Sequence, residues 1–130
     1  MMREPSAESD RLASAVFEAS LEVHRNLGPG FLESVYQKSL EHELTLRQVP
    51  FEREKPIQLR YKDQPVGDAR LDFLVGGLVV VELKSVESLL PIHHAQVLNY
   101  LKATQLDLGL LVNFNEVLLK DGFKRIVQTQ

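Results

Sequence analysis

The feature that most constrains the fold is an unbroken aliphatic run at positions 78–81, followed directly by Glu82, Leu83 and Lys84. A continuous apolar run of this length is typical of a strand buried on both faces of a sheet. Side chains alternate along a strand, so Glu82 and Lys84 are expected on one side and Leu83 on the other. Charges at the end of a buried strand are costly to desolvate unless a metal or a bound anion offsets them. The run therefore predicts a central strand with a functional site at its end.

The rest of the chain predicts helices before this strand, and further strands and a helix around it. Apolar residues at steps of three or four predict helices over residues 10–26 and 31–47, with a glycine-rich stop at 28–30. Alternation with a period of two predicts strands at 57–61 and 71–75, before the strand at 78–84. A third helix is expected over 91–105 and another buried strand over 108–114. Asp121-Gly122, between two strand-like runs, predicts a C-terminal β-hairpin.

These elements predict an α/β fold with a mixed sheet flanked by helices. The strand–helix–strand passage over 78–114 should give two parallel strands, whereas short turns should make the earlier strands antiparallel. A chain of 130 residues suits one core. We therefore expect a single domain over residues 10–130, preceded by a flexible lead-in at residues 1–9.

Composition excludes several classes of site and partner. Without cysteine, the chain has no disulfide framework, thiolate zinc site or cysteine nucleophile. The net charge of -3 counts against strong nonspecific binding to DNA, although a bound metal would weaken that objection. No apolar stretch approaches the ~20 residues that span a bilayer, and the polar N-terminus does not resemble a signal peptide. We expect a cytoplasmic protein without a membrane partner.

Asp72 precedes Glu82, and the turn between them decides whether their carboxylates can meet. A two-residue loop at Gly76-Gly77 would pair Asp72 with Val81 and send Glu82 to the opposite face. A three-residue loop would pair Asp72 with Glu82, and glycine tolerates the positive φ that such a loop demands. We therefore predict an odd-length loop or a bulge, and a clean two-residue hairpin would exclude a shared metal.

Together, Asp72, Glu82 and Lys84 are the minimal parts for holding Mg²⁺ against a phosphodiester. The alternative is a surface Glu–Lys pair that contributes little to stability. The buried character of the strand and its antiparallel partner favour the functional interpretation.

Further polar residues are candidates for the same site. Glu33 shares a helical stripe with Tyr36, so it should face inward, although a first-turn glutamate favoured by the helix dipole is equally consistent. Gln96 and Tyr100 are four residues apart on one helix face, where they could contact phosphate or a base, or simply edge the core. Arg70 shares the Asp72 face by alternation, and either an ion pair or a contact with nucleic acid would explain it.

Several motifs in order resemble the GxxExxY family, a branch of the PD-(D/E)XK nuclease superfamily. The naming motif is present as Gly30-x-x-Glu33-x-x-Tyr36, and the resemblance covers residues 10–127, nearly the whole chain. It departs from the superfamily pattern where Leu71 replaces the proline before the aspartate. The other matching segments are Arg70-Leu71-Asp72-Phe73, Val81-Glu82-Leu83-Lys84, Ala95-Gln96-Val97-Leu98-Asn99-Tyr100-Leu101 and Leu110-Leu111-Val112-Asn113-Phe114.

The resemblance implies an αβββαβ core with an extra N-terminal helix and a C-terminal hairpin. It implies that Asp72 and Glu82 hold Mg²⁺ or Mn²⁺, with the backbone carbonyl of Leu83 as a further ligand. Glu33 would support the metal from the helix, and Lys84 would serve the attacking water.

The resemblance also implies a set of substrate contacts. Gln96 and Tyr100 match the Q-x-x-x-Y helix motif of recombination-type nucleases, and we add Arg70, His93 and Tyr36 as residues expected to bind substrate. The expected function is metal-dependent hydrolysis of nucleic acid, with DNA favoured. The alternative is a catalytically inactive module of the same fold that binds nucleic acid or a protein partner. A homodimer that pairs two sites across a duplex is a further possibility.

Overall fold

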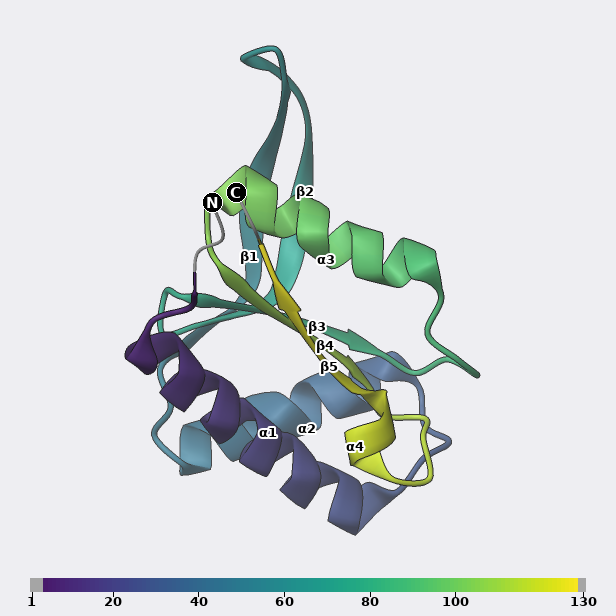
Figure 1. The fold of residues 1–130 in the computed structure, drawn as a ribbon. Helices are drawn as coiled ribbons and strands as arrows, with labels where there is room; N and C mark the ends of the chain where they lie inside the picture. Colours follow the sequence, from purple (N-terminus) through teal and green to yellow (C-terminus); the bar gives the residue numbers. More distant parts are fainter. Residues whose placement is uncertain (1–3, 129–130) are drawn as a thin grey trace.

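The computed structural model describes residues 4–128, which form a mixed five-stranded sheet flanked by helices on both faces (Figure 1). The strand order is β1-β2-β3-β4-β5; β3 and β4 are parallel, and the other neighbours are antiparallel. This confirms the predicted α/β core, its N-terminal helix and its one parallel pair. The strands are β1 (Phe51–Tyr61), β2 (Gln64–Val75), β3 (Val79–Lys84), β4 (Leu108–Asn113) and β5 (Phe123–Val127). The helices are α1 (Ala7–Leu27), α2 (Glu33–Leu46), α3 (Pro91–Thr104) and α4 (Leu119–Gly122).

Two apolar layers hold the helices to the sheet. Helices α1 and α2 cover one face, where Val16, Leu40 and Phe73 belong to the larger buried cluster (Figure 1). Helix α3 covers the other face, where Val97 packs with Val80 in a second cluster. Within residues 4–128, no helix has the length and apolar content needed to cross a membrane. The sheet is therefore buried on both faces at β3 and β4, as the apolar run predicted.

The first helix begins earlier than expected. Residues 7–9, predicted to lie in a flexible lead-in, are the first turn of α1. The Ser6 hydroxyl accepts a hydrogen bond from the Ser9 N–H at 3.1 Å, which satisfies one of the free amides at the helix start. The expected lead-in is therefore wrong for residues 7–9, and residues 1–3 lie outside the described residues.

The predicted C-terminal hairpin is also wrong. Asp121 and Gly122 belong to the short helix α4, and β5 pairs instead with the free edge of β4. Of the apolar residues expected to form the first hairpin strand, Val117 is 83% exposed whereas Leu119 is buried. A Cβ at Gly122 would lie 2.4 Å from the Asn113 carbonyl oxygen, so the turn packs too closely for any other residue. Pairing with β4 and packing against α1 therefore override the local Asp-Gly signal.

The loop between β2 and β3 has the length that a shared site requires. Val75 pairs with Val79, so the loop contains the three residues Gly76, Gly77 and Leu78. Both glycines have positive φ values, 59° and 70°, and the Leu78 N–H donates to the Val75 carbonyl at 3.1 Å. The prediction of an odd-length loop is confirmed, and the register places Asp72 opposite Glu82.

The β1–β2 hairpin changes its inward face partway along its length. Phe51 on β1 packs against the α1–α2 cluster, whereas Ile57, six residues later, packs against the α3 cluster. Strict alternation would keep both residues on one face. The change occurs at Glu54, which has a φ of 54° and, with Asp72 opposite, is missing from the ladder of paired residues. The outer half of the hairpin consequently turns toward α3 and extends past it (Figure 1).

Candidate active site

Asp72 and Glu82 meet where β2 and β3 stop pairing. The backbone ladder ends at Phe73 and Val81, and side-chain oxygens replace it at the next position. The Asp72 N–H donates to Glu82 Oε2 at 2.9 Å, and the Leu83 N–H donates to Asp72 Oδ2 at 2.8 Å. Each carboxyl group is therefore held by the backbone of the opposite strand. The structure brings the two acids together between the strands, as the loop length required.

Glu82 is protonated at neutral pH in the metal-free protein. Its side chain is only 4% exposed, and burial, followed by the nearby charge of Asp72, raises its pKa from 4.5 to about 9. A side-chain hydrogen bond with Asp72 raises the pKa further, while the hydrogen bond from the Asp72 backbone and the charge of Lys84 oppose the shift. The two carboxyl groups thus share a proton, the usual outcome for buried acids at this spacing.

Helix α2 contributes two polar residues to the site. Glu33 is the first residue of α2, and its pKa is raised by burial and by the charge of Asp72, whereas Lys84 lowers it. The Gln37 amide donates to Glu33 Oε1 at 3.3 Å and to Asp72 Oδ1 at 3.2 Å. Gln37 therefore bridges the two acids. It was not among the predicted site residues, although its position four residues after Glu33 on the same helix face was a usable signal.

Helix α3 places a second group of polar side chains beside the acids. Burial and the charge of Glu82 raise the pKa of Tyr100, with Asp72 adding to the shift, while the hydrogen bond from Gln96 to its hydroxyl at 3.1 Å opposes it. His93 Nδ1 accepts the Leu90 N–H at 3.0 Å and so caps the start of α3. Lys84 joins these residues in lining one pocket of about 380 Å³. Its lining consists of Leu59, Lys84, Ile92, His93, Gln96, Asn99 and Tyr100.

Tyr36 is a structural residue, so its predicted role in binding substrate is wrong. Its side chain is fully buried and stacks on Phe114 with ring centroids 4.6 Å apart. Its hydroxyl donates to the Gly28 carbonyl at 2.6 Å and accepts the Phe31 N–H at 3.2 Å. Tyr36 therefore fixes the loop between α1 and α2, the loop that leads into Glu33. The motif position predicted its importance but not that its hydroxyl is already used.

Arg70 lies on the outer part of β2, and neither inference about its surroundings holds. It is exposed and, within residues 4–128, forms no ion pair, so the ion-pair interpretation is wrong. Alternation does not carry it to the Asp72 face, because Leu71 packs in the α3 cluster while Phe73 packs in the α1–α2 cluster. Its contact with nucleic acid stays a prediction.

The donor groups at this site suit a small divalent cation. No group of three or more His, Cys, Asp or Glu side chains is arranged to hold a metal within residues 4–128, so the candidate ligands are two acids and a backbone oxygen. Mg²⁺ prefers few protein oxygens and several waters. The Lys84 carbonyl accepts the Phe114 N–H on the β4 side, so the Leu83 carbonyl, one residue earlier, faces the β2 side with its N–H. A cation could replace the proton that the buried acids share.

The chain was compared with families, curated proteins and solved structures. The family model of the PD-(D/E)XK nuclease superfamily matches residues 10–126. Neither the comparison with curated proteins nor that with solved structures gave a significant match.

Proposed function

Because the chain belongs to the PD-(D/E)XK nuclease superfamily, we propose that it hydrolyses phosphodiester bonds of nucleic acid with Mg²⁺ or Mn²⁺, and that DNA is its substrate. The observation that carries this proposal is the meeting of Asp72 and Glu82 between β2 and β3, with Lys84 one turn of the pleat further on. We also assign the chain to the GxxExxY branch on Gly30, Glu33 and Tyr36, and treat residues 10–130 as one domain.

Asp72, Glu82 and the Leu83 carbonyl would hold the metal ion. When bound, such an ion lowers the pKa of a coordinated water and polarises the phosphate. Glu82 must release its proton when the ion binds, which makes the affinity depend on pH. Asp72 stays oriented because the Leu83 N–H and the Gln37 amide each bind one of its oxygens. The acids therefore enter the reaction already positioned.

Lys84 is the group best placed to act on the substrate. Its ammonium shares a pocket with Tyr100 and Gln96 and lies near enough to Glu82 and Glu33 to lower the pKa of both. In this position it would orient the attacking water and stabilise the charge that develops on the phosphate oxygens. Tyr100 and Gln96, joined by their hydrogen bond, would line the path of the scissile strand.

The experiment is a cleavage assay on linear, circular, single-stranded and duplex DNA with Mn²⁺, and with EDTA in place of the metal. We expect cleavage only with the metal. Lys84→Ala should lose at least about 100-fold in turnover but keep its Mn²⁺ affinity, and Asp72→Ala should lose both. Lys120→Ala, which removes an exposed lysine from α4, is the matched control.

Two outcomes would reject the proposal. Cleavage retained by Lys84→Ala or Asp72→Ala, in a preparation whose wild type is active, would place the chemistry elsewhere. A wild type that neither binds Mn²⁺ nor cuts any of the substrates would favour the noncatalytic module.

A further inference from the structure

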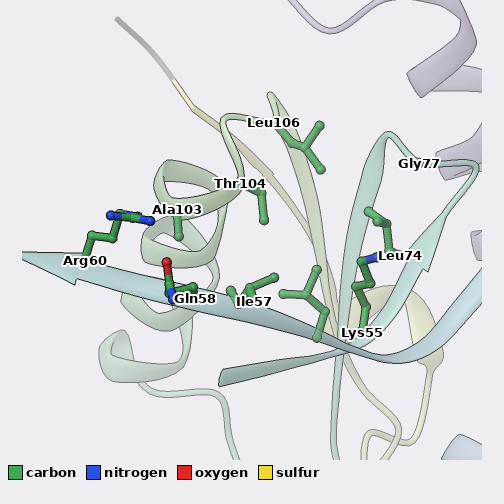
Figure 2. Close-up of a pocket in the computed structure, with 10 residues that line it drawn as sticks. Lys55, Ile57, Gln58, Arg60, Leu74, Gly77, Ala103, Thr104 and Leu106 are labelled. Carbon is green, nitrogen blue, oxygen red and sulfur yellow. The ribbon is translucent and has the colours of Figure 1, made fainter. Parts of the chain in front are cut away.

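Three adjoining cavities lie between the β1–β2 hairpin and α3, and the first is the pocket that holds Lys84. The second, of about 520 Å³, meets the first at Leu59 and Asn99. The third, of about 460 Å³, meets the second at Gln58, Arg60 and Ala103. Figure 2 shows the third cavity, with residues of β1 on one side and the end of α3 on the other. We call this continuous depression the β1–α3 groove.

The lining of the β1–α3 groove is predominantly basic, although the whole chain has a net charge of -3. Arg60, Lys102, Lys55 and Lys84 line it, and Asp63 is the one acidic lining residue. Arg60 donates to the backbone carbonyl of Asp63, at 2.8 Å, rather than to its carboxylate. Lys102 forms no ion pair within the part of the chain that the structure describes, whereas Lys55 is paired with Glu52 at 3.0 Å. Arg60 and Lys102 therefore offer uncommitted positive charge to an anionic ligand.

The groove also offers apolar surface, which distinguishes between nucleic acid ligands. Ile57, Leu74 and Leu106 line the third cavity together with the methylene and amide groups of its polar residues (Figure 2). The bases of a duplex are stacked on one another, so only a single strand can place base faces against such side chains. A chain with few net positive charges also lacks the broad basic surface that duplex binding uses.

From this juxtaposition we propose that the β1–α3 groove binds single-stranded nucleic acid and leads it to the Lys84 end, where the strand is cut. Arg60 and Lys102 contact phosphates, and the apolar lining accepts bases. The statement about cutting rests on the proposed function, but the binding of a single strand does not. The hairpin thus acts as one wall of a strand channel, which explains why it turns toward α3 and extends beyond the sheet (Figure 1).

The first test measures binding in EDTA, so that no cleavage occurs. A fluorescein-labelled oligothymidylate of about ten nucleotides, within the usual length that single-strand grooves cover, is titrated with the protein and compared with a duplex of equal length. We expect tighter binding of the single strand. Arg60→Ala/Lys102→Ala should weaken it about tenfold at low salt and reduce the slope of log affinity against log salt by about 1.

The control for this variant is Arg25→Ala/Lys120→Ala, which removes the same charges from exposed positions on α1 and α4. It should bind the oligothymidylate like the wild type. Equal affinity and equal salt slope in the groove variant and the wild type, or a wild type that prefers the duplex, would overturn the inference.

A second test does not depend on losing Arg60, whose hydrogen bond within the hairpin could matter for folding. Because the chain has no cysteine, Ala103→Cys introduces a unique thiol where the second and third cavities meet. Oligothymidylate should slow its labelling by a maleimide several-fold. Thr45→Cys, exposed on α2, should label at the same rate with and without the oligonucleotide. Equal rates for Ala103→Cys under both conditions would contradict the groove.

The inference and the proposed function fail in different ways. If the groove variants lose single-strand binding but no wild-type substrate is cleaved, the proposed hydrolysis is wrong and the groove stands. If the wild type cleaves DNA and Arg60→Ala/Lys102→Ala cleaves and binds it equally well, the groove is wrong and the hydrolysis stands.

Discussion

Replacing Glu82 with glutamine should stabilise the metal-free protein at neutral and alkaline pH. Glutamine has the shape of protonated Glu82, so its oxygen can accept the Asp72 N–H and its amide can donate to the Asp72 carboxylate. The variant keeps these hydrogen bonds without having to take up a proton. The wild type must hold a proton that its unfolded chain has already lost.

The magnitude follows from the shifted pKa. The group titrates near 4.5 in the unfolded chain and at about 9 in the folded protein. The folded state therefore binds the extra proton between these values, and stability from this group is full below pH 4.5 and falls as the pH rises toward 9. At pH 7 the cost corresponds to about 2.5 pH units at about 1.36 kcal/mol each, so about 3 kcal/mol is an upper bound. Because the two acids titrate together and an amide is an imperfect substitute, we expect a gain of about 1–2 kcal/mol.

The assay is urea unfolding of wild type and Glu82→Gln in EDTA at several pH values between 5 and 9. The difference in free energy of unfolding should be near zero at pH 5 and grow steadily with pH. Glu18→Gln, an exposed position on α1, controls for loss of a carboxylate and should show no such trend. A Glu82→Gln variant that is less stable than wild type at pH 8, or a difference that does not change with pH, would refute the reasoning.

Three other substitutions test separate parts of the structure. Gln37→Ala removes the amide that orients Asp72, so it should lower Mn²⁺ affinity about tenfold in a titration while leaving the melting temperature of the metal-free protein nearly unchanged. Tyr36→Phe should destabilise the protein by about 1–2 kcal/mol in urea unfolding, because it removes the hydroxyl that fixes the loop before α2, and Mn²⁺ affinity should persist. Gly76→Ala should destabilise the protein by about 1–3 kcal/mol, since the added Cβ would lie 2.5 Å from Leu12 Cδ1 at a residue with a φ of 59°. A melting curve equal to that of the wild type would contradict the predicted loop geometry.

The sequence predicted the parts of the fold that depend on local pattern. Helical periodicity located α1, α2 and α3 to within a few residues, and the apolar run located β3. The pairing of Val75 with Val79 could be anticipated, because a buried site at Asp72 and Glu82 is compatible only with an odd-length loop. These predictions succeeded because hydrophobic burial and register are set by neighbouring residues.

The misses depend on contacts between distant parts of the chain. Asp121-Gly122 is a genuine turn signal, but the free edge of β4 was a better partner for β5 than a short strand at 117–120. Glu54 reverses the face of the hairpin through a positive φ that a non-glycine residue rarely adopts, so no alternation pattern could have revealed it. Gln37 was recognisable only by its helical spacing from Glu33, because the sequence does not show where Asp72 lies relative to α2.

The most direct test of a shared metal site is calorimetric titration of Mn²⁺ into the metal-free wild type and Asp72→Ala near pH 7.5, in buffers with different ionisation enthalpies. The wild type should bind the ion and release about one proton per ion as Glu82 ionises, so the observed heat should change with the buffer, while Asp72→Ala should give no binding heat. Wild type that takes up no Mn²⁺, or Asp72→Ala that binds it equally well, would contradict the account.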